Sequence, residues 1–335
     1  MRLVRVIERL LGSIPVILGV LIIVFFFMRL LPGDPVEIML GDSAASISEM
    51  ESLRQELHLD EPLPKQLWLF ISGLFQGDLG YSVVKRQPVL ELILETIPPT
   101  VELTLAAVFM AILIALPVGV LTSLRPGSIF DRATMSGALL GISMPNFWLG
   151  LILILVFCVH LGWFPTSGRL GSDFTIARVT GFLTLDAILT GNWAAFWDAV
   201  KHLLIPATTL GVAFAAVLAR VIRSSMLEVM RMEYVTAARA KGVPETAVII
   251  KHALRNAMIP AVTVAGLEVG KLLGGNMIVE TIFSWPGLGR LVVSSIFSRD
   301  YVVVQSAVML YALTYVMANL TVDVVYTYLN PKIEL

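Results

Sequence analysis

Apolar residues along this chain gather into long runs that are separated by polar stretches. A run of about 20 apolar residues, wound as a helix, matches the thickness of a bilayer's hydrocarbon core. The pattern predicts six membrane-spanning helices, at residues 10–31, 101–124, 135–161, 203–222, 258–283 and 302–325. We therefore expect an all-α membrane protein.

The composition supports this fold class and excludes several functions. Apolar residues make up 57% of the chain and charged residues 15%, whereas soluble domains have about 45–50% and about 25%. The net charge of −1 gives no basis for a nucleic-acid partner. A single cysteine, Cys158, excludes an internal disulfide, and the four histidines show no metal-ligand spacing, so no metal site is predicted.

The distribution of Lys and Arg predicts the orientation. The loop 223–258 carries six of them: Arg223, Arg231, Arg239, Lys241, Lys251 and Arg255. Short cytoplasmic segments of membrane proteins are enriched in these residues. We predict that both termini and the loop 223–258 lie inside.

The predicted spans divide the chain into four parts. Residues 1–31 form the first spanning helix, and 32–96 form an extracytoplasmic loop subdomain. Residues 97–328 form a transmembrane core of five helices that includes the loop 223–258, and 329–335 form a cytoplasmic tail. Within the subdomain, SISEMESLRQELHLDEP and PKQLWLFISGLFQGDLG each predict a helix, the second ending at Gly77 or Gly80.

The loop 223–258 predicts two helices joined by a turn. SSMLEVMRMEYVTAARAK contains no Gly or Pro, Gly242 suits a helix C-terminus, and Pro244 suits the start of the next helix. Ala237 and Ala238 allow another backbone to approach closely, and Tyr234 is a side chain that interfaces favour. A basic loop that sets the topology and rests on lipid headgroups would also fit these residues.

Several motifs carry a family resemblance. AARAKG (237–242) resembles the EAA loop of ABC importer permeases, although Thr236 stands where the glutamate of that motif would be. The whole chain resembles the dipeptide, oligopeptide and nickel branch of type I importer permeases. The segments that carry this likeness are MRLLPGDPVE, GDLGYS, SMPNFW, PTSGR, ARVIRSSMLEV, ARAKG, HALRNAMIPAVT, ETIFSWPGLGRL and LNPKI.

The resemblance implies a type I ABC importer permease fold in which a cytoplasmic coupling helix contacts an ATPase. The coupling residues would be Glu233, Tyr234, Thr236, Ala237, Ala238, Arg239, Lys241 and Gly242. It also implies two ATPase subunits that bind ATP and Mg, a second permease, an extracytoplasmic binding protein and the inner membrane's lipid. This chain itself would need no cofactor and no catalytic residue. AGLEVGKLL lacks the first glycine and the Ser or Thr of a P-loop.

Glu268 and Lys271 lie in the middle of the fifth predicted span, three residues apart and hence on one helix face. Because charges are costly at that depth, they either neutralise each other inside the bundle or line a substrate path together with Asn276. The tight turn SWPGLGR contains Trp285, Pro286 and Gly287, which we assign to an extracytoplasmic gate or docking rim.

The predicted function is import of di- or oligopeptides across the inner membrane by alternating access. Nickel, glutathione or sugar import by the same machinery stays an alternative, as does a symmetric pair of identical permeases. A stand-alone secondary transporter is disfavoured because six spans without inverted repeats do not match that class. We expect Glu102, near a span end, to reach the lipid headgroups.

Overall fold

The computed structural model describes the chain apart from residues 1, 31–35, 37–46, 57, 83 and 330–335. Most of the predicted tail 329–335 and the first part of the predicted subdomain 32–96 therefore lie outside the described residues. The described part is built of helices and one short hairpin, in which β1 (Tyr81–Ser82) pairs antiparallel with β2 (Gln87–Pro88). The expectation of an all-α architecture is confirmed for this part of the chain.

Four described helices are long and apolar enough to cross a membrane. They are α5 (Val89–Leu124), α9 (Trp193–Val229), the continuous segment Glu245–Leu273 and the Tyr301–Ala318 part of α15 (Tyr301–Leu329). A fifth results if α6 (Ile129–Ser143) and the following helix Asn146–His160 count as one broken span. α1 (Arg2–Leu30) contains a shorter apolar segment, Leu11–Phe27. Every predicted apolar run thus lies in a helix or a helix pair.

The third predicted span is not one straight helix but a pair of helices with a sharp bend between them. α6 ends at Ser143, and α7 (Asn146–Leu153) begins at an angle of 105° to it. Met144 is extended, with ψ 129°, because the residue before a proline is pushed out of the helical region. α7 continues as the π-helix η1 (Ile154–His160).

The fifth predicted span is also shorter than expected. After α11 (Glu245–Ala247) and the π-helix η2 (Val248–Leu254), α12 (Arg255–Gly275) ends at a glycine pair. Asn276 then separates it from α13 (Met277–Ile282). Residues 277–283 therefore belong to a separate element beyond the long helix. Two consecutive glycines weaken a helix, which explains the position of the break.

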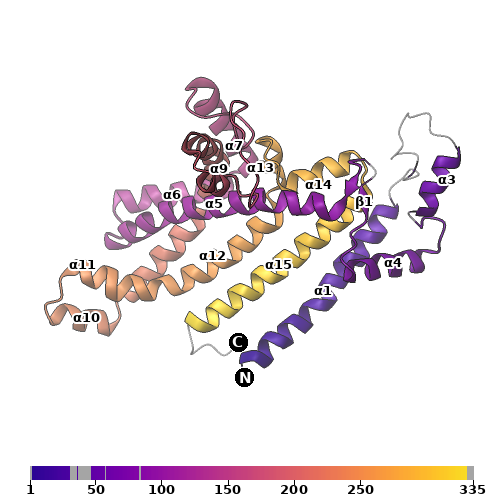
Figure 1. Cartoon of the computed structure of the whole chain (residues 1–335). Coiled ribbons are helices and arrows are strands. Elements are labelled where there is room, and N and C mark those ends of the chain that lie inside the picture. The colour runs from indigo at the N-terminus through magenta and orange to yellow at the C-terminus, as the bar shows by residue number, and fades with distance from the viewer. Residues whose placement is uncertain (1, 31–35, 37–46, 57, 83, 330–335) are drawn as a thin grey trace.

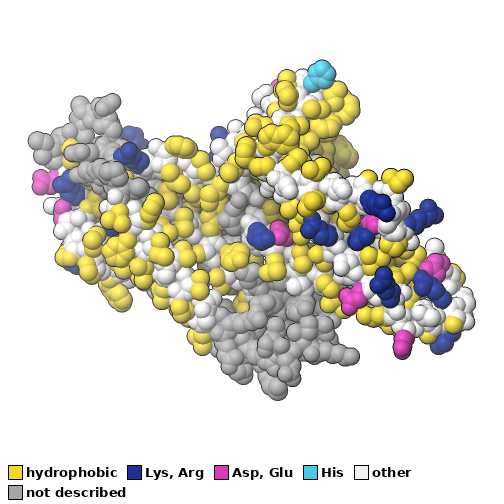
Figure 2. Space-filling view, turned by 180° about the vertical axis from the view of Figure 1, so that it is seen from behind, with side chains coloured by type: hydrophobic (Ala, Val, Ile, Leu, Met, Phe, Trp, Pro, Cys, Tyr) yellow, Lys and Arg dark blue, Asp and Glu magenta, His cyan; other side chains and the backbone are white. Residues whose placement is uncertain are grey.

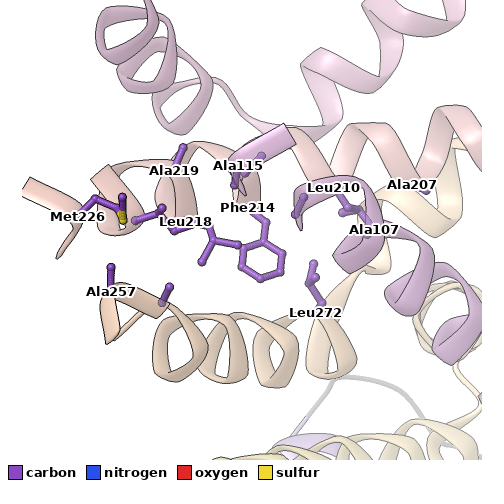
Figure 3. Packing of buried hydrophobic residues seen from close by; sticks show 14 of the residues in the cluster. Ala107, Ala115, Ala207, Leu210, Phe214, Leu218, Ala219, Met226, Ala257 and Leu272 are labelled. Carbon is purple, nitrogen blue, oxygen red and sulfur yellow. The ribbon is translucent and has the colours of Figure 1, made fainter. Parts of the chain in front are cut away.

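The core lies between α5 and α9, which pack against each other along most of their lengths. Ala107, Ala111 and Ala115 of α5, spaced four residues apart, are fully buried in this contact. Such small side chains let two helix backbones approach closely, which is how helices associate in a membrane. Figure 3 shows Phe214 of α9 in this cluster, with Leu272 of α12 opposite.

The long helices place two sets of short elements at opposite ends of the molecule (Figure 1). α10 (Glu233–Ala240) and α11 lie at one end, which we call the α10 end. The hairpin and α14 (Leu288–Phe297) lie at the other, the α14 end. α3 (Ile47–Glu56) and α4 (Leu63–Phe75) confirm the two helices predicted after residue 46, and α8 (Leu183–Leu189) precedes α9.

Candidate functional site

The predicted helix from Ser224 to Lys241 is interrupted. α9 ends at Val229, the chain turns, and α10 starts at Glu233 after Met232 in an extended conformation. Nothing in the local sequence breaks the helix. The turn lets Val235 and Ala238 pack back into the core, where they are 0% and 8% exposed. Burial of these side chains outweighs the local preference for one long helix.

α10 therefore has a buried face and an exposed face. Most residues predicted to contact an ATPase are exposed: Glu233, Tyr234, Thr236, Ala237, Arg239, Lys241 and Gly242. Ala238 instead packs inside the chain. The exposed face is short and contains small side chains, so a partner's backbone has room to come near.

The turn after α10 forms as predicted. Gly242 has φ +78°, a left-handed conformation that glycine adopts without strain, and Pro244 precedes α11. Arg239 then joins the two helices, because its Nε and Nη2 donate to the two Glu245 carboxylate oxygens at 3.1 and 2.7 Å. This paired contact bridges the turn between α10 and α11 at the surface of the molecule.

Tyr234 fixes α10 to a second element. Its hydroxyl accepts a hydrogen bond from Asn256 Nδ2 at 2.7 Å and donates to the carbonyl oxygen of His252 at 3.3 Å. His252 lies in the π-helix η2. The hydrogen-bond pattern of a π-helix differs from that of an α-helix, so different backbone carbonyl groups are available to side chains such as Tyr234. The sequence suggested Tyr234 as an anchor for a partner, whereas the structure uses its hydroxyl within the chain.

A further ion pair near the α10 end joins α9 to α6. Arg223 donates from Nε and Nη2 to the two oxygens of Asp131, at 2.6 and 2.7 Å. Asp131 is 2% exposed and also accepts from the backbone N–H of Gly127 at 2.8 Å. The sequence analysis counted Arg223 only as a topology signal. Its partner lies 92 positions away and gives no local sign of the contact.

The α10 end is strongly basic. Arg231, Lys241, Lys251 and Arg255 are all exposed there. Figure 2 shows Lys and Arg side chains gathered at this end of the molecule, with a few acidic side chains among them. Such a surface suits acidic partners and anionic lipid headgroups.

The two charged residues of α12 form an ion pair, a contact that fits either of the alternatives left open by the sequence. Lys271 Nζ contacts Glu268 Oε1, and the side chains are 63% and 21% exposed in the single chain. Asn276 does not join them: it is buried and donates to the carbonyl oxygen of Leu272 at 2.8 Å, which closes the end of α12. The structure therefore brings together two of the three residues that we assigned to a path.

At the α14 end, buried contacts stabilise the predicted turn SWPGLGR. Trp285 is 1% exposed, and its Nε1 donates to the carbonyl oxygen of Pro99 in α5 at 2.8 Å. The neighbouring Thr100 donates to Glu280 Oε1 at 2.8 Å and accepts from the backbone N–H of Leu288 at 2.8 Å. The start of α5 is thus tied to both sides of the turn.

Glu280 organises the rest of this turn. Its side chain is fully buried, and its Oε2 accepts from the backbone N–H of Arg290 at 3.0 Å. A Cβ at Gly287 or Gly289 would lie 2.5 or 2.9 Å from this carboxyl group, so both positions need glycine for close approach. Glu280 lies beyond the long helix α12, and burial raises its pKa from 4.5 to about 6.

A partly buried ion pair supports the same turn from its other side. Arg169 contacts Glu102 Oε2, and its guanidinium lies 5.4 Å from the ring centroid of Trp285. Glu102 Oε1 accepts from the backbone N–H and hydroxyl of Thr184, at 2.8 and 2.6 Å. The expectation that Glu102 reaches lipid headgroups was wrong, because this side chain is 6% exposed.

We call this group the latch and define it as Pro99, Thr100, Glu102, Arg169, Glu280 and Trp285. Sequence analysis singled out the segments around Arg169 and Trp285 as motifs but gave no sign that they meet. Their partners on α5 lie 67 to 186 positions away. Pro286 and Gly287, which were predicted with Trp285, face a cavity beside the latch.

Comparison with known families identifies the chain. Residues 115–335 match the family described as binding-protein-dependent transport system inner membrane component, and residues 2–104 match the N-terminal part of such membrane components. The chain belongs to this family. It is therefore a multi-pass protein of the inner membrane and a permease component of a binding-protein-dependent transport system.

Similar proteins match over almost the full length. The di/tripeptide transport system permease protein DppB of Pseudomonas aeruginosa is 46% identical over 321 residues, 96% of each chain. The dipeptide transport system permease protein DppB of Escherichia coli is 44% identical over 333 residues, 98% of each chain. The glutathione transport system permease protein GsiC of Escherichia coli is 43% identical over 329 residues, again 98% of each.

A solved structure shows the same fold. It is described as an inward-facing conformation of the MetNI methionine ABC transporter. The match has a TM-score of 0.54 at 20% identity and covers 71% of this chain and 96% of that chain. Most of this chain thus shares the fold of a chain of that ABC transporter.

Proposed function

We propose that this chain is the permease subunit of an ATP-driven importer that moves di- and oligopeptides across the inner membrane. The observation that carries the proposal is the near full-length similarity to permeases named for dipeptide and tripeptide transport. Glutathione, the solute named for another relative, is itself a small peptide derivative and forms the second candidate substrate. The transport mechanism is alternating access, in which the helix bundle opens to one side of the membrane at a time.

The proposed topology has six crossings with both termini inside, and the α10 end faces the cytoplasm. The basic surface at that end supports this orientation, since exposed Lys and Arg collect on the inner side. On this topology the α14 end, α3 and α4 face outside. The division into residues 1–31, 32–96, 97–328 and 329–335 follows these crossings, with the second boundary falling inside the continuous helix α5.

α10 is proposed as the coupling helix that contacts an ATPase subunit. Its exposed face, which includes the small residues Thr236 and Ala237, supports this role, and contacts of Tyr234 and Arg239 connect α10 to the segment that follows it. Closure of two ATPase subunits upon ATP binding would displace α10 and the helices joined to it. ATP and Mg bind to those subunits, and this chain contributes no catalytic group.

The exposed ion pair on α12 supports a second permease. A charged residue in the middle of a span costs roughly 2.5–3.5 kcal/mol when it faces lipid. Lys271 is 63% exposed in the single chain, although it lies on a long apolar helix. We propose that this face of α12 lines a watered path at the contact with a second, homologous permease. Asn276 caps the C-terminus of the same helix, beyond the ion pair.

The latch is proposed as the outer gate of this path. It ties α5 to the turn between α13 and α14 and faces the side where the binding protein delivers substrate. Most of its members are buried and bonded to one another, which supports a closed outer end in this structure. Opening that end would require these contacts to break together.

Transport by the complete importer tests the substrate. Both permeases, both ATPases and the binding protein are reconstituted in liposomes, and uptake of radiolabelled Ala-Ala is measured with and without ATP. We expect ATP-dependent uptake of Ala-Ala that excess unlabelled dipeptide suppresses. Uptake of glutathione or nickel with none of Ala-Ala would contradict the peptide assignment.

A matched pair of substitutions tests the coupling helix. Ala237→Leu adds bulk to the exposed face of α10, and we expect ATPase subunits to co-purify at about one tenth of the wild-type level or less. Ala133→Leu adds the same bulk to an exposed position on α6 and serves as the control. Equal ATPase recovery for the two variants would argue against the proposed contact.

A further inference from the structure

A cavity of about 580 Å³ lies beside the latch, where the hairpin, the start of α5 and α14 meet. Its wall includes Lys85 and Gln87 from the hairpin region, Glu95 from α5, and Pro286, Gly287 and Arg290 from the turn and α14. We call this cavity the hairpin pocket. Its volume lies within the range of about 300–1,000 Å³ that small-molecule sites occupy. A dipeptide or tripeptide fits a space of this size.

The charged groups of the hairpin pocket favour a carboxylate. Lys85 and Arg290 are exposed, and the guanidinium of Arg290 makes one hydrogen bond within the described chain, from Nη1 to the carbonyl oxygen of Ser284 at 2.7 Å. Its remaining guanidinium donors, like the Lys85 ammonium, have no hydrogen-bond partner among the described residues. A guanidinium fork is the group that holds a carboxylate by two parallel hydrogen bonds.

The pocket also carries one negative group. Glu95 lies on α5, and its carboxylate contacts Arg178 at 3.2 Å, with both side chains more than half exposed. An exposed pair of this kind contributes little and exchanges partners easily. A ligand's ammonium group can therefore share or replace Arg178. Leu92 and Leu291 supply apolar surface between the charged groups.

We propose that the hairpin pocket is a binding site for a short peptide, held by its C-terminal carboxylate at Arg290 and Lys85 and by its ammonium group at Glu95. This inference rests on the proposed function, because it assumes that peptides reach the outer face of this chain. It differs from the path assigned to α12, which lies along a separate helix.

The position of the pocket gives it access to the latch. Pro286 and Gly287 form part of its wall, while the next residue towards the N-terminus, Trp285, points inwards to Pro99. Arg290 lines the pocket with its side chain and donates its backbone N–H to Glu280. A peptide in the pocket would thus touch the segment whose contacts keep the outer end closed.

Binding to the complete importer without the binding protein tests the proposal. The assembly is placed in lipid nanodiscs, and saturation-transfer NMR measures the affinity for Ala-Ala, for its C-terminal amide and for its N-acetyl derivative. Wild-type importer should bind Ala-Ala saturably, and amidation should weaken binding about tenfold, since it removes a charge-assisted contact. Acetylation should weaken it less, because Glu95 already has a partner.

Variants place the binding at this pocket. Arg290→Gln and, separately, Lys85→Gln should each weaken Ala-Ala binding several-fold, and Arg290→Lys should restore part of it. Lys201→Gln, at an exposed lysine near the start of α9, is the control and should bind as wild type does. If Arg290→Gln does not assemble, Lys85→Gln alone decides the outcome.

Three results would overturn the proposal: no saturable binding of Ala-Ala to wild type, equal binding by wild type and Lys85→Gln, or unchanged peptide binding together with weaker docking of the binding protein. The last result would show a protein-docking surface. Ala-Ala uptake by the wild-type liposomes separates this failure from that of the proposed function. Uptake of Ala-Ala without binding in the hairpin pocket would refute only the peptide-site proposal. Binding in the pocket without uptake would refute only the proposed import function.

Discussion

The indole N–H of Trp285 donates to the carbonyl oxygen of Pro99 at 2.8 Å, although 186 positions separate the two residues. This contact joins the first third of one long helix, α5, to the turn between the two short helices α13 and α14. Around it lie the buried carboxyl group of Glu280 and the partly buried guanidinium of Arg169. A few specific polar contacts therefore hold the α14 end together, and they join segments that lie far apart in the sequence.

Trp285→Phe should loosen the latch. The change keeps most of the apolar ring but removes one hydrogen bond, whose net contribution is about 1 kcal/mol. We expect ATP hydrolysis by the assembled importer, measured without binding protein, to rise up to about fivefold, because the outer end opens more readily. Trp68→Phe, at a position 70% exposed, is the control. Unchanged hydrolysis by Trp285→Phe would argue against a gating role.

Glu280 should make the stability of the latch depend on pH. Burial raises its pKa from 4.5 to about 6, so the folded protein binds this proton more tightly than the unfolded chain does. The stabilising contribution is fully present below pH 4.5 and is lost as the pH rises through about 6, by about 2 kcal/mol in all.

The experiment compares thermal unfolding of the purified importer between pH 4.5 and 7.5. Glu280→Gln cannot titrate, so the difference in midpoint between wild type and this variant should change over that range. Glu91→Gln, at an exposed carboxyl on the same side, should run parallel to wild type. Parallel curves for Glu280→Gln would refute a raised pKa at this position.

Arg223→Lys should weaken the link between α9 and α6. A lysine cannot make the two parallel hydrogen bonds to Asp131, which is 3% exposed in its side chain, so one carboxylate oxygen loses its charged partner. We expect a loss of about 2 kcal/mol, seen as a lower unfolding midpoint. Arg220→Lys, one turn earlier and exposed, should have no measurable effect. A double-mutant cycle with Asp131→Asn isolates the pair.

Tyr234→Phe should free one end of α10. The substitution removes both hydroxyl contacts, to Asn256 and to His252, from a partly exposed residue. The expected cost is about 1 kcal/mol. Hydrogen exchange of the backbone amides in α10, followed by mass spectrometry, should become about fivefold faster. Tyr315→Phe, exposed on α15, is the matched control, and similar exchange in both variants would contradict the role of Tyr234.

Local features of the fold were predictable, because each rests on neighbouring residues. The apolar runs gave the helices, Gly242 and Pro244 gave the turn after α10, and the spacing of Glu268 and Lys271 gave their ion pair. Pro145 was visible too, but prolines such as Pro117 lie inside α5 without ending it. The bend after α6 depends on how α7 packs, which the sequence pattern does not contain.

The latch was not predictable as a unit. Glu102 and Glu280 each lie in or next to an apolar run, where a single carboxyl gives no information about its partner. Arg169 and Thr184 come from a polar segment that has no periodic pattern. In the folded chain Glu102 contacts both Arg169 and Thr184, and Glu280 contacts Thr100, two residues before Glu102. Buried polar contacts between distant segments are determined by the whole fold.

α9 runs without interruption from Trp193 to Val229, which is 37 residues or about 55 Å of helix. Near its C-terminus, Arg223 binds Asp131 of α6. Its first turns follow α8, which contains Thr184. One continuous helix, with Pro206 inside it, therefore reaches from the neighbourhood of α10 to the neighbourhood of the latch. A small tilt of α9 imposed at one end would displace its other end. The contact of Arg223 with Asp131 and the contacts around Thr184 can therefore be mechanically coupled through this helix.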